Sequence, residues 1–196
     1  MRSDDDEKRN AAVKEFELMK RLDHENIVRV HDCIQVKGTV YIVMELVEGM
    51  ELFEAIASID RYCEDDARKL FYQILQAIKY MHQNGVCHRD IKPSNIMVAK
   101  KKKIIKVTDF NISKFANNAS MQTLTGTETF KAPEMLSGKE YSTKVDIWSA
   151  GCVLFTLLIG QQPFLEGKIA DLHANIKAAK LKLENGPEWK ELSTDA

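Results

Sequence analysis

Residues 88–95 read HRDIKPSN and form the densest cluster of polar groups in the chain. The segment places an acid, Asp90, between two cations, Arg89 and Lys92, and adds an amide, Asn95, within eight residues. Taken alone, such a cluster is more often a salt-bridged turn than a site. Catalytic residues, however, concentrate in loops that rigid elements hold in place. The elements that flank the segment therefore decide between the two interpretations.

Patterns of helix and strand lie on both sides of the segment. Residues 64–83 carry apolar side chains at helical spacing, and Gly85 follows as the expected end of that helix. Downstream, 96–99 and 104–108 are short apolar runs around four lysines, a pattern typical of a hairpin. The segment 88–95 is therefore predicted to be a loop between a long helix and a β-hairpin.

Farther from this loop, the sequence predicts strands first and helices after. The expected elements are an amphipathic helix over 5–22, a hairpin of 27–36 and 39–46, and helices over 52–58, 145–159 and 169–183. The segment 145–159 is nearly all apolar, as expected for a helix that is buried on all sides. Residues 111–130 show neither helical nor strand periodicity and are rich in Asn, Ser and Thr. A loop of this length is usually functional or disordered.

The composition is that of an ordinary soluble domain. The 196 residues are 44% hydrophobic and 29% charged, with a net charge of −1 that favours neither nucleic acid nor an anionic membrane. The longest apolar run, 147–160, is shorter than the roughly 20 residues of a membrane-spanning helix. Residues 1–10 lack the apolar core of a secretory signal. We therefore expect a cytoplasmic location, with the nucleus left open, four reduced cysteines, no nucleic-acid partner and no membrane span.

Two more motifs follow the loop in order. DFN at 109–111 closes the hairpin around the lysines, and APE at 132–134 comes after the polar loop. Together with HRDIKPSN they match the order and spacing of H-R-D-x-x-x-x-N, D-F-G and A-P-E. The chain therefore resembles a eukaryotic protein kinase catalytic domain. The resemblance implies an α+β, bilobal fold, with a partial small β lobe over 1–48 and a mostly helical large lobe over 49–196.

Shorter matches point to one branch of that family. HRDIKPSN, with Lys92 two residues after Asp90, resembles the serine/threonine branch. YIVMELVEGMELFEAI (41–56), DDARKLFYQILQAIKYMH (65–82) and GPEWKELS (186–193) resemble calcium/calmodulin-dependent and calcium-dependent kinases. The resemblance implies a serine/threonine kinase that transfers the γ-phosphoryl group of MgATP to protein hydroxyls. Its expected partners are protein substrates and a calcium-sensing regulatory segment or calmodulin outside this chain.

Phosphoryl transfer needs positioning and charge neutralisation more than covalent chemistry. By the resemblance, Asp90 would accept or orient the proton of the substrate hydroxyl, and Lys92 would place a cation beside the transferring group. Asn95 and Asp109 would supply oxygen ligands to Mg²⁺, which is a hard cation. Asp146, at a buried helix start, would hydrogen-bond the backbone of the catalytic loop, residues 88–95, and support it.

The resemblance also implies a nucleotide site. Its expected residues are Glu15, Met44, Glu45, Val47, Glu51, Lys92, Met97, Asn95 and Asp109. Met44 would close the back of the adenine pocket, the backbone of 45–47 would meet the adenine edge, and Leu52 and Met97 would lie below the ring. Glu51 is also the candidate partner of a substrate arginine, so we expect basic residues upstream of the target hydroxyl.

The loop 111–130 carries the expected regulation. Thr123 lies four residues before Thr127. By the resemblance, Thr123 occupies the position at which many kinases are phosphorylated, and Arg89 would receive that phosphate. Arg89, Thr127, Glu134 and Asp146 are expected to be structural supports. Asn111 stands where the family has glycine. Because Asn reaches positive φ more readily than most residues, Mg²⁺ binding is expected to survive this exchange.

Part of the family's pattern is missing from the sequence. No G-x-G-x-x-G occurs, and no strand that could supply the lysine partner of Glu15 precedes it. The chain also stops where the family continues into further helices. Three interpretations stay open: a fragment of an active serine/threonine kinase with little or no turnover by itself, a short pseudokinase that binds or scaffolds, or motifs retained in another phosphotransferase or a structural protein.

Overall fold

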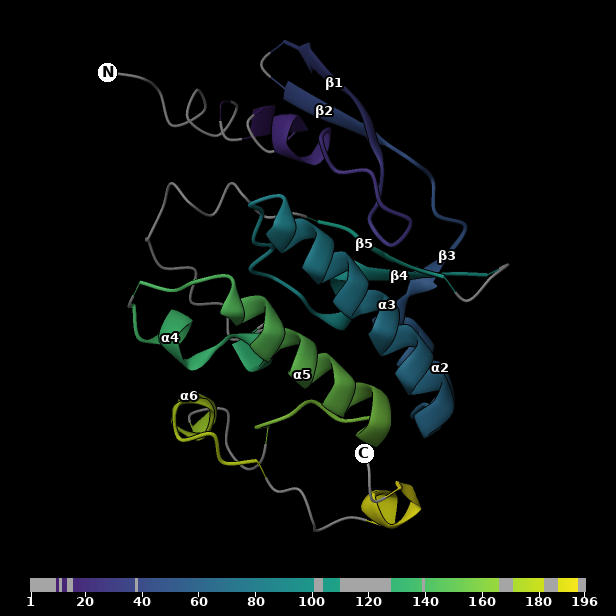
Figure 1. Cartoon of the computed structure of the whole chain (residues 1–196), viewed down its shortest axis with the longest axis vertical. Helices are drawn as coiled ribbons and strands as arrows, with labels where there is room; N and C mark the ends of the chain where they lie inside the picture. The colour runs from purple at the N-terminus through teal and green to yellow at the C-terminus, as the bar shows by residue number, and fades with distance from the viewer. Residues whose placement is uncertain are drawn as a thin grey trace.

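The computed structural model describes residues 10, 12, 13, 16–37, 39–100, 104–109, 128–138, 140–165, 171–181 and 187–193. The elements in chain order are β1 (Val30–Val36), β2 (Thr39–Met44), β3 (Gly49–Glu51), α2 (Leu52–Ile59), α3 (Glu64–Gln83), η1 (Pro93–Asn95), β4 (Ile96–Ala99), β5 (Ile105–Val107), η3 (Glu128–Phe130), α4 (Pro133–Leu136), α5 (Lys144–Ile159), α6 (Leu172–Lys177) and η5 (Pro187–Glu191). Small antiparallel sheets and a larger helical part make the predicted α+β fold (Figure 1).

The hairpin of β1 and β2 lies at one end of the molecule, beside the helical residues 16–19 (Figure 1). The two strands are antiparallel and turn at Lys37, whose φ is 48°. The hairpin is confirmed, but β1 begins later than predicted because the residues before it pair elsewhere. Val28 N–H donates to the Val107 carbonyl at 2.9 Å, and Val107 N–H donates to the Asn26 carbonyl at 2.9 Å. These bonds join the hairpin to β5 of the second sheet.

The loop 88–95 lies between the two predicted elements. α3 spans the expected residues Glu64–Gln83 and ends where Gly85 takes a φ of 72°, which costs glycine little. On the other side, β4 and β5 pair in antiparallel fashion with Ile96 opposite Val107, and β3 adds a third strand along β4. The loop is therefore anchored by a long helix at one end and a three-stranded sheet at the other.

The helix α5 packs against α3 and carries much of the core. The apolar sequence predicts that α5 is buried on all sides, and this prediction is wrong for one stripe of the helix. Ile147 is 51% exposed, and Gly151, four residues later on the same face, is exposed as well. α6 is also shorter than the predicted helix 169–183, because Ala179 has a φ of 48°, outside the helical range.

The four cysteines are free thiols, as expected. Burial raises the pKa of Cys152 to about 12, and burial, assisted by the Asp146 carboxylate, raises the pKa of Cys87 to about 12. In the metal-free protein both thiols therefore stay protonated near neutral pH. Within the described part of the chain, no helix combines the length and apolar character that crossing a membrane requires.

Candidate active site

The catalytic loop is ordered around the carboxylate of Asp90, which is 9% exposed. Its Oδ2 accepts a hydrogen bond from Lys92 Nζ at 2.9 Å and another from Asn95 Nδ2 at 3.1 Å. Asn95 Nδ2 also donates to the Asp90 carbonyl at 2.8 Å. The loop thus brings the acid, the cation and the amide of HRDIKPSN into one network, with the cation and the amide holding the same carboxylate oxygen.

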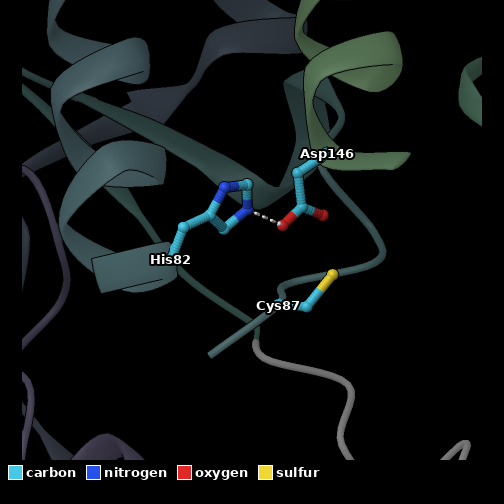
Figure 2. Close-up of side chains that lie close together, drawn as sticks. All are labelled: His82, Cys87 and Asp146. Atoms are coloured by element: carbon cyan, nitrogen blue, oxygen red, sulfur yellow. Dashed lines mark hydrogen bonds and ion pairs between the residues drawn. The ribbon is translucent and has the colours of Figure 1, made fainter. Parts of the chain in front are cut away.

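The carboxylate of Asp146 lies directly behind this loop. The residue stands in the first turn of α5 and is 0% exposed. Its Oδ1 accepts the Arg89 N–H at 2.7 Å, and its Oδ2 accepts the His88 N–H at 2.9 Å and His82 Nε2 at 2.8 Å (Figure 2). Sequence reasoning misses His82, since its only signal is a place in the last turn of α3. One buried acid therefore ties α3 and the catalytic loop to α5.

The imidazole of His88 bridges the loop and the end of β5. Its Nε2 lies 3.0 Å from the Thr108 carbonyl, and Asp90 N–H donates to its Nδ1 at 3.3 Å. Because a carbonyl only accepts, Nε2 carries the proton and Nδ1 is the acceptor. Complete burial lowers the pKa of His88, although the Asp146 carboxylate opposes this effect. His88 is therefore neutral at physiological pH.

We expect the neutral, buried His88 to make the fold less stable in mild acid. The unfolded chain takes up a proton at this residue near its ordinary pKa of about 6.5, whereas the folded chain does not. Stability is then complete above that pH, and the free energy of unfolding falls by up to about 1.4 kcal/mol per pH unit below it. The measurement is urea unfolding between pH 7.5 and 5.5 of the wild type and of His88→Gln, which cannot titrate. Identical pH slopes for the two proteins would contradict the prediction.

Asp109 and Asn95 offer oxygen atoms suited to a divalent cation. Asp109 follows β5, is exposed and has a φ of 58°, while Thr108 N–H donates to the Asn95 carbonyl at 2.9 Å and joins the two segments. Asn95 Nδ2 donates both of the side-chain hydrogen bonds described above, so the amide oxygen can serve as a ligand. A carboxylate and an amide oxygen fit Mg²⁺. Phe110 and Asn111, and with them the expected effect of DFN, lie outside the described residues.

The segment expected to meet the adenine follows β2. Met44 ends that strand and is 42% exposed. Glu45 N–H donates to the Arg29 carbonyl at 2.9 Å, so Glu45 can offer a nucleotide only its carbonyl. Burial acts to raise the pKa of the Glu45 carboxyl, but hydrogen bonds from Lys106 and the Arg29 N–H outweigh it and lower the pKa. The carboxylate therefore ties this segment to β5 through Lys106, a partner that sequence reasoning misses.

The floor of the expected nucleotide site differs in part from the prediction. Met97 of β4 lies opposite Glu51 of β3, so these two residues are neighbours across the sheet. Glu51 is also the N-cap of α2, and its N–H donates to Glu54 Oε2 at 3.3 Å. Leu52 is 0% exposed and belongs to the core. Its predicted place below the ring is therefore wrong for this conformation, because its neighbours already cover it. Val47 is half-buried and packs against the core.

The expected regulatory residues are described only in part. The Arg89 guanidinium lies over the Tyr141 ring, 5.5 Å from its centroid. Glu134 is half-buried in the first turn of α4. Glu15, Thr123 and Thr127 lie outside the described residues. Sequence reasoning misses a link close to this region, in which Glu128 Oε2 lies 2.6 Å from His173 Nε2 of α6.

Comparison with known proteins finds similarity to protein kinases throughout. Residues 1–196 match the family model described as protein kinase domain. The chain is 40% identical over 184 residues to a probable myosin light chain kinase of Dictyostelium discoideum, covering 90% of this chain and 46% of that protein. It is 38% identical over 191 residues to a calcium/calmodulin-dependent protein kinase type 1 of Caenorhabditis elegans, covering 96% and 55%. A calcium/calmodulin-dependent protein kinase type II of Caenorhabditis briggsae is 40% identical over 186 residues, covering 93% and 35%. The chain thus spans about half the length of the first two relatives and less of the third.

Proposed function

Because the chain belongs to the protein kinase family, we propose that it carries the catalytic loop of a serine/threonine kinase that uses MgATP to phosphorylate protein hydroxyls. The observation that carries the proposal is the shared carboxylate oxygen of Asp90, held by Lys92 and Asn95. This arrangement supplies a positioned acceptor for a hydroxyl proton together with a cation beside it. We also propose that residues 1–48 and 49–196 belong to the small and the large lobe, and that the protein acts in the cytoplasm.

Asp90 and Lys92 have distinct roles in this proposal. The Asp90 carboxylate orients the substrate hydroxyl and accepts its proton. Lys92 donates one hydrogen bond to Asp90, and an ammonium group has three donors. Lys92 can therefore reach a phosphoryl oxygen while it still holds Asp90. The His88 ring and the Asp146 carboxylate touch the loop backbone and keep these two side chains in place.

Asn95 and Asp109 are the proposed ligands of Mg²⁺. When bound, the ion neutralises phosphate charge, which is much of what phosphoryl transfer requires. The hydrogen bond from Thr108 N–H to the Asn95 carbonyl keeps the two ligand-bearing segments adjacent. Of the expected adenine contacts, the Glu45 carbonyl and the backbone of Val47 remain in the proposal. Met44 stays the proposed rear wall, Met97 the floor, and Glu15 the partner of a phosphate-binding lysine.

Replacing Asp109 by Ala is expected to weaken Mg²⁺-dependent binding of ATP at least about tenfold, since loss of a ligand costs no less than loss of its supporting partner. The measurement is nucleotide affinity by calorimetry with and without Mg²⁺. Asp65→Ala removes another exposed carboxylate, in the first turn of α3, and is the matched control. Equal Mg²⁺ dependence in the wild type and in Asp109→Ala would refute the assigned role.

The substrate class is proposed from the family branch. The relatives are named for calcium/calmodulin dependence, which supports a calcium-sensing segment or calmodulin outside this chain as a partner. Matched peptides with Ser, Thr or Tyr at the target position, with and without an upstream arginine, test the class directly. Phosphorylation of the Ser and Thr peptides, favoured by the arginine, is the expected result. Binding of MgATP without transfer to any peptide would instead favour a pseudokinase.

A further inference from the structure

A cluster of three metal-binding side chains lies behind the catalytic loop, and the function proposed above does not use it as such. His82 comes from the last turn of α3, Cys87 from the segment before the loop, and Asp146 from the first turn of α5 (Figure 2). Their ligand atoms, one nitrogen, one sulfur and one carboxylate oxygen, all lie within 4.8 Å of one another. We propose that these three side chains bind a zinc ion.

The donor set favours zinc over the magnesium of the nucleotide site. Imidazole and thiolate suit Zn²⁺, whereas Mg²⁺ prefers oxygen ligands alone. Tetrahedral zinc holds its ligands at about 2.0–2.3 Å, which separates the ligand atoms by roughly 3.4–3.7 Å. His82 Nε2 and Asp146 Oδ2 lie 2.8 Å apart, and no pair in the cluster exceeds 4.8 Å. The separation that zinc requires lies between the 2.8 Å of this pair and the 4.8 Å upper bound, so small rotations of the side chains can admit the ion.

The position of the cluster also gives the ion an entry path. The Asp146 side chain is 0% exposed, but the His82 side chain is 20% exposed, so the ion can enter from the side of α3. On binding, His82 presents an unprotonated Nε2 to the metal and carries its single ring proton on Nδ1, while Cys87 releases its proton to water. Three protein ligands and a water then complete the coordination.

Zinc at this place would act on the catalytic loop. Asp146 Oδ2 accepts the His88 N–H as well as His82 Nε2, whereas Oδ1 accepts the Arg89 N–H. A metal on Oδ2 competes with the bond to His88 and leaves the bond to Arg89. Zinc is therefore expected to slow phosphoryl transfer. This consequence rests on the proposed function, whereas the binding itself does not.

The test is titration of the metal-free chain with Co²⁺, followed by displacement with Zn²⁺. The expected result is one equivalent of Co²⁺ with a thiolate-to-cobalt absorption band, which Zn²⁺ abolishes. Cys87→Val keeps the packing volume and is expected to lose the band and to bind zinc at least about tenfold more weakly. Cys63→Ser is the matched control, because Cys63 is an exposed thiol outside the cluster. This variant should keep both the absorption band and the affinity for zinc.

A second variant keeps the test decisive if Cys87→Val does not fold. His82→Gln retains a donor toward Asp146 but removes the imidazole, so it should fold and bind zinc at least about tenfold more weakly. Absence of the band in the wild type, or a band that survives both substitutions, overturns the proposal. Zinc binding in a protein that phosphorylates no peptide would leave the zinc site standing and count against the proposed function.

Discussion

Asp90→Asn is expected to lower the rate of peptide phosphorylation at least about a hundredfold, the low end for loss of a positioned acid–base group. The variant keeps the size of the side chain, but an amide cannot take up the proton of the substrate hydroxyl. Because Lys92 Nζ and Asn95 Nδ2 both donate to Asp90 Oδ2, the amide oxygen can take that position and keep both bonds. The measurement is the initial rate with a Ser or Thr peptide at saturating MgATP, in the protein that carries this chain.

Two controls separate this loss from unfolding. Affinity for MgATP should stay unchanged in Asp90→Asn, since the amide oxygen can keep the bonds that hold Lys92 and Asn95 in place. Asp65→Asn removes an exposed carboxylate of α3 and should keep the full rate. Retained phosphorylation by Asp90→Asn would overturn the assignment of Asp90. A wild type that binds MgATP but transfers nothing would make the pseudokinase interpretation the correct one.

The elements nearest the catalytic loop could be predicted from local pattern alone. The helix α3 begins and ends at the expected residues, because its apolar stripe is long and Gly85 marks its end. The exposed stripe of α5 could not be predicted, since Ile147 is as apolar as its buried neighbours and only the packing partners decide which face is covered. The short α6 likewise depends on the backbone of Ala179, for which the sequence carries no signal.

The same distinction holds within the candidate site. Asp90, Lys92 and Asn95 stand within six residues, so their spacing alone brings them into one loop. His82 and Asp146 are 64 residues apart in sequence, and nothing in either pattern indicates that they meet. Lys106 and Glu45 form a half-buried ion pair across 61 residues for the same reason. Long-range partners follow from how α3, α5 and the sheet pack, which local sequence does not encode.

Asp146→Ala is expected to lower the free energy of unfolding by about 3–5 kcal/mol, the range for removing one partner of a buried charged network. The carboxylate is 0% exposed and accepts the His88 N–H, the Arg89 N–H and His82 Nε2. Its removal leaves these donors without their acceptor, and an unsatisfied buried donor costs about 1–3 kcal/mol. The measurement is equilibrium unfolding in urea at neutral pH, with both the midpoint and the slope determined.

Asp146→Asn distinguishes the charge from the acceptor. The amide keeps one acceptor oxygen but places an NH₂ group against a donor, so its loss of stability should be smaller than that of Asp146→Ala yet clearly measurable. Asp65→Ala, at an exposed carboxylate, should change the free energy of unfolding by less than about 0.5 kcal/mol. If Asp146→Ala were no less stable than Asp65→Ala, the buried carboxylate would not hold the loop. Asp146 touches the backbone of the catalytic loop and not the Asp90 carboxylate. Folded Asp146→Asn should therefore phosphorylate peptides more slowly, because the loop backbone loses part of its support. Its affinity for MgATP should be normal.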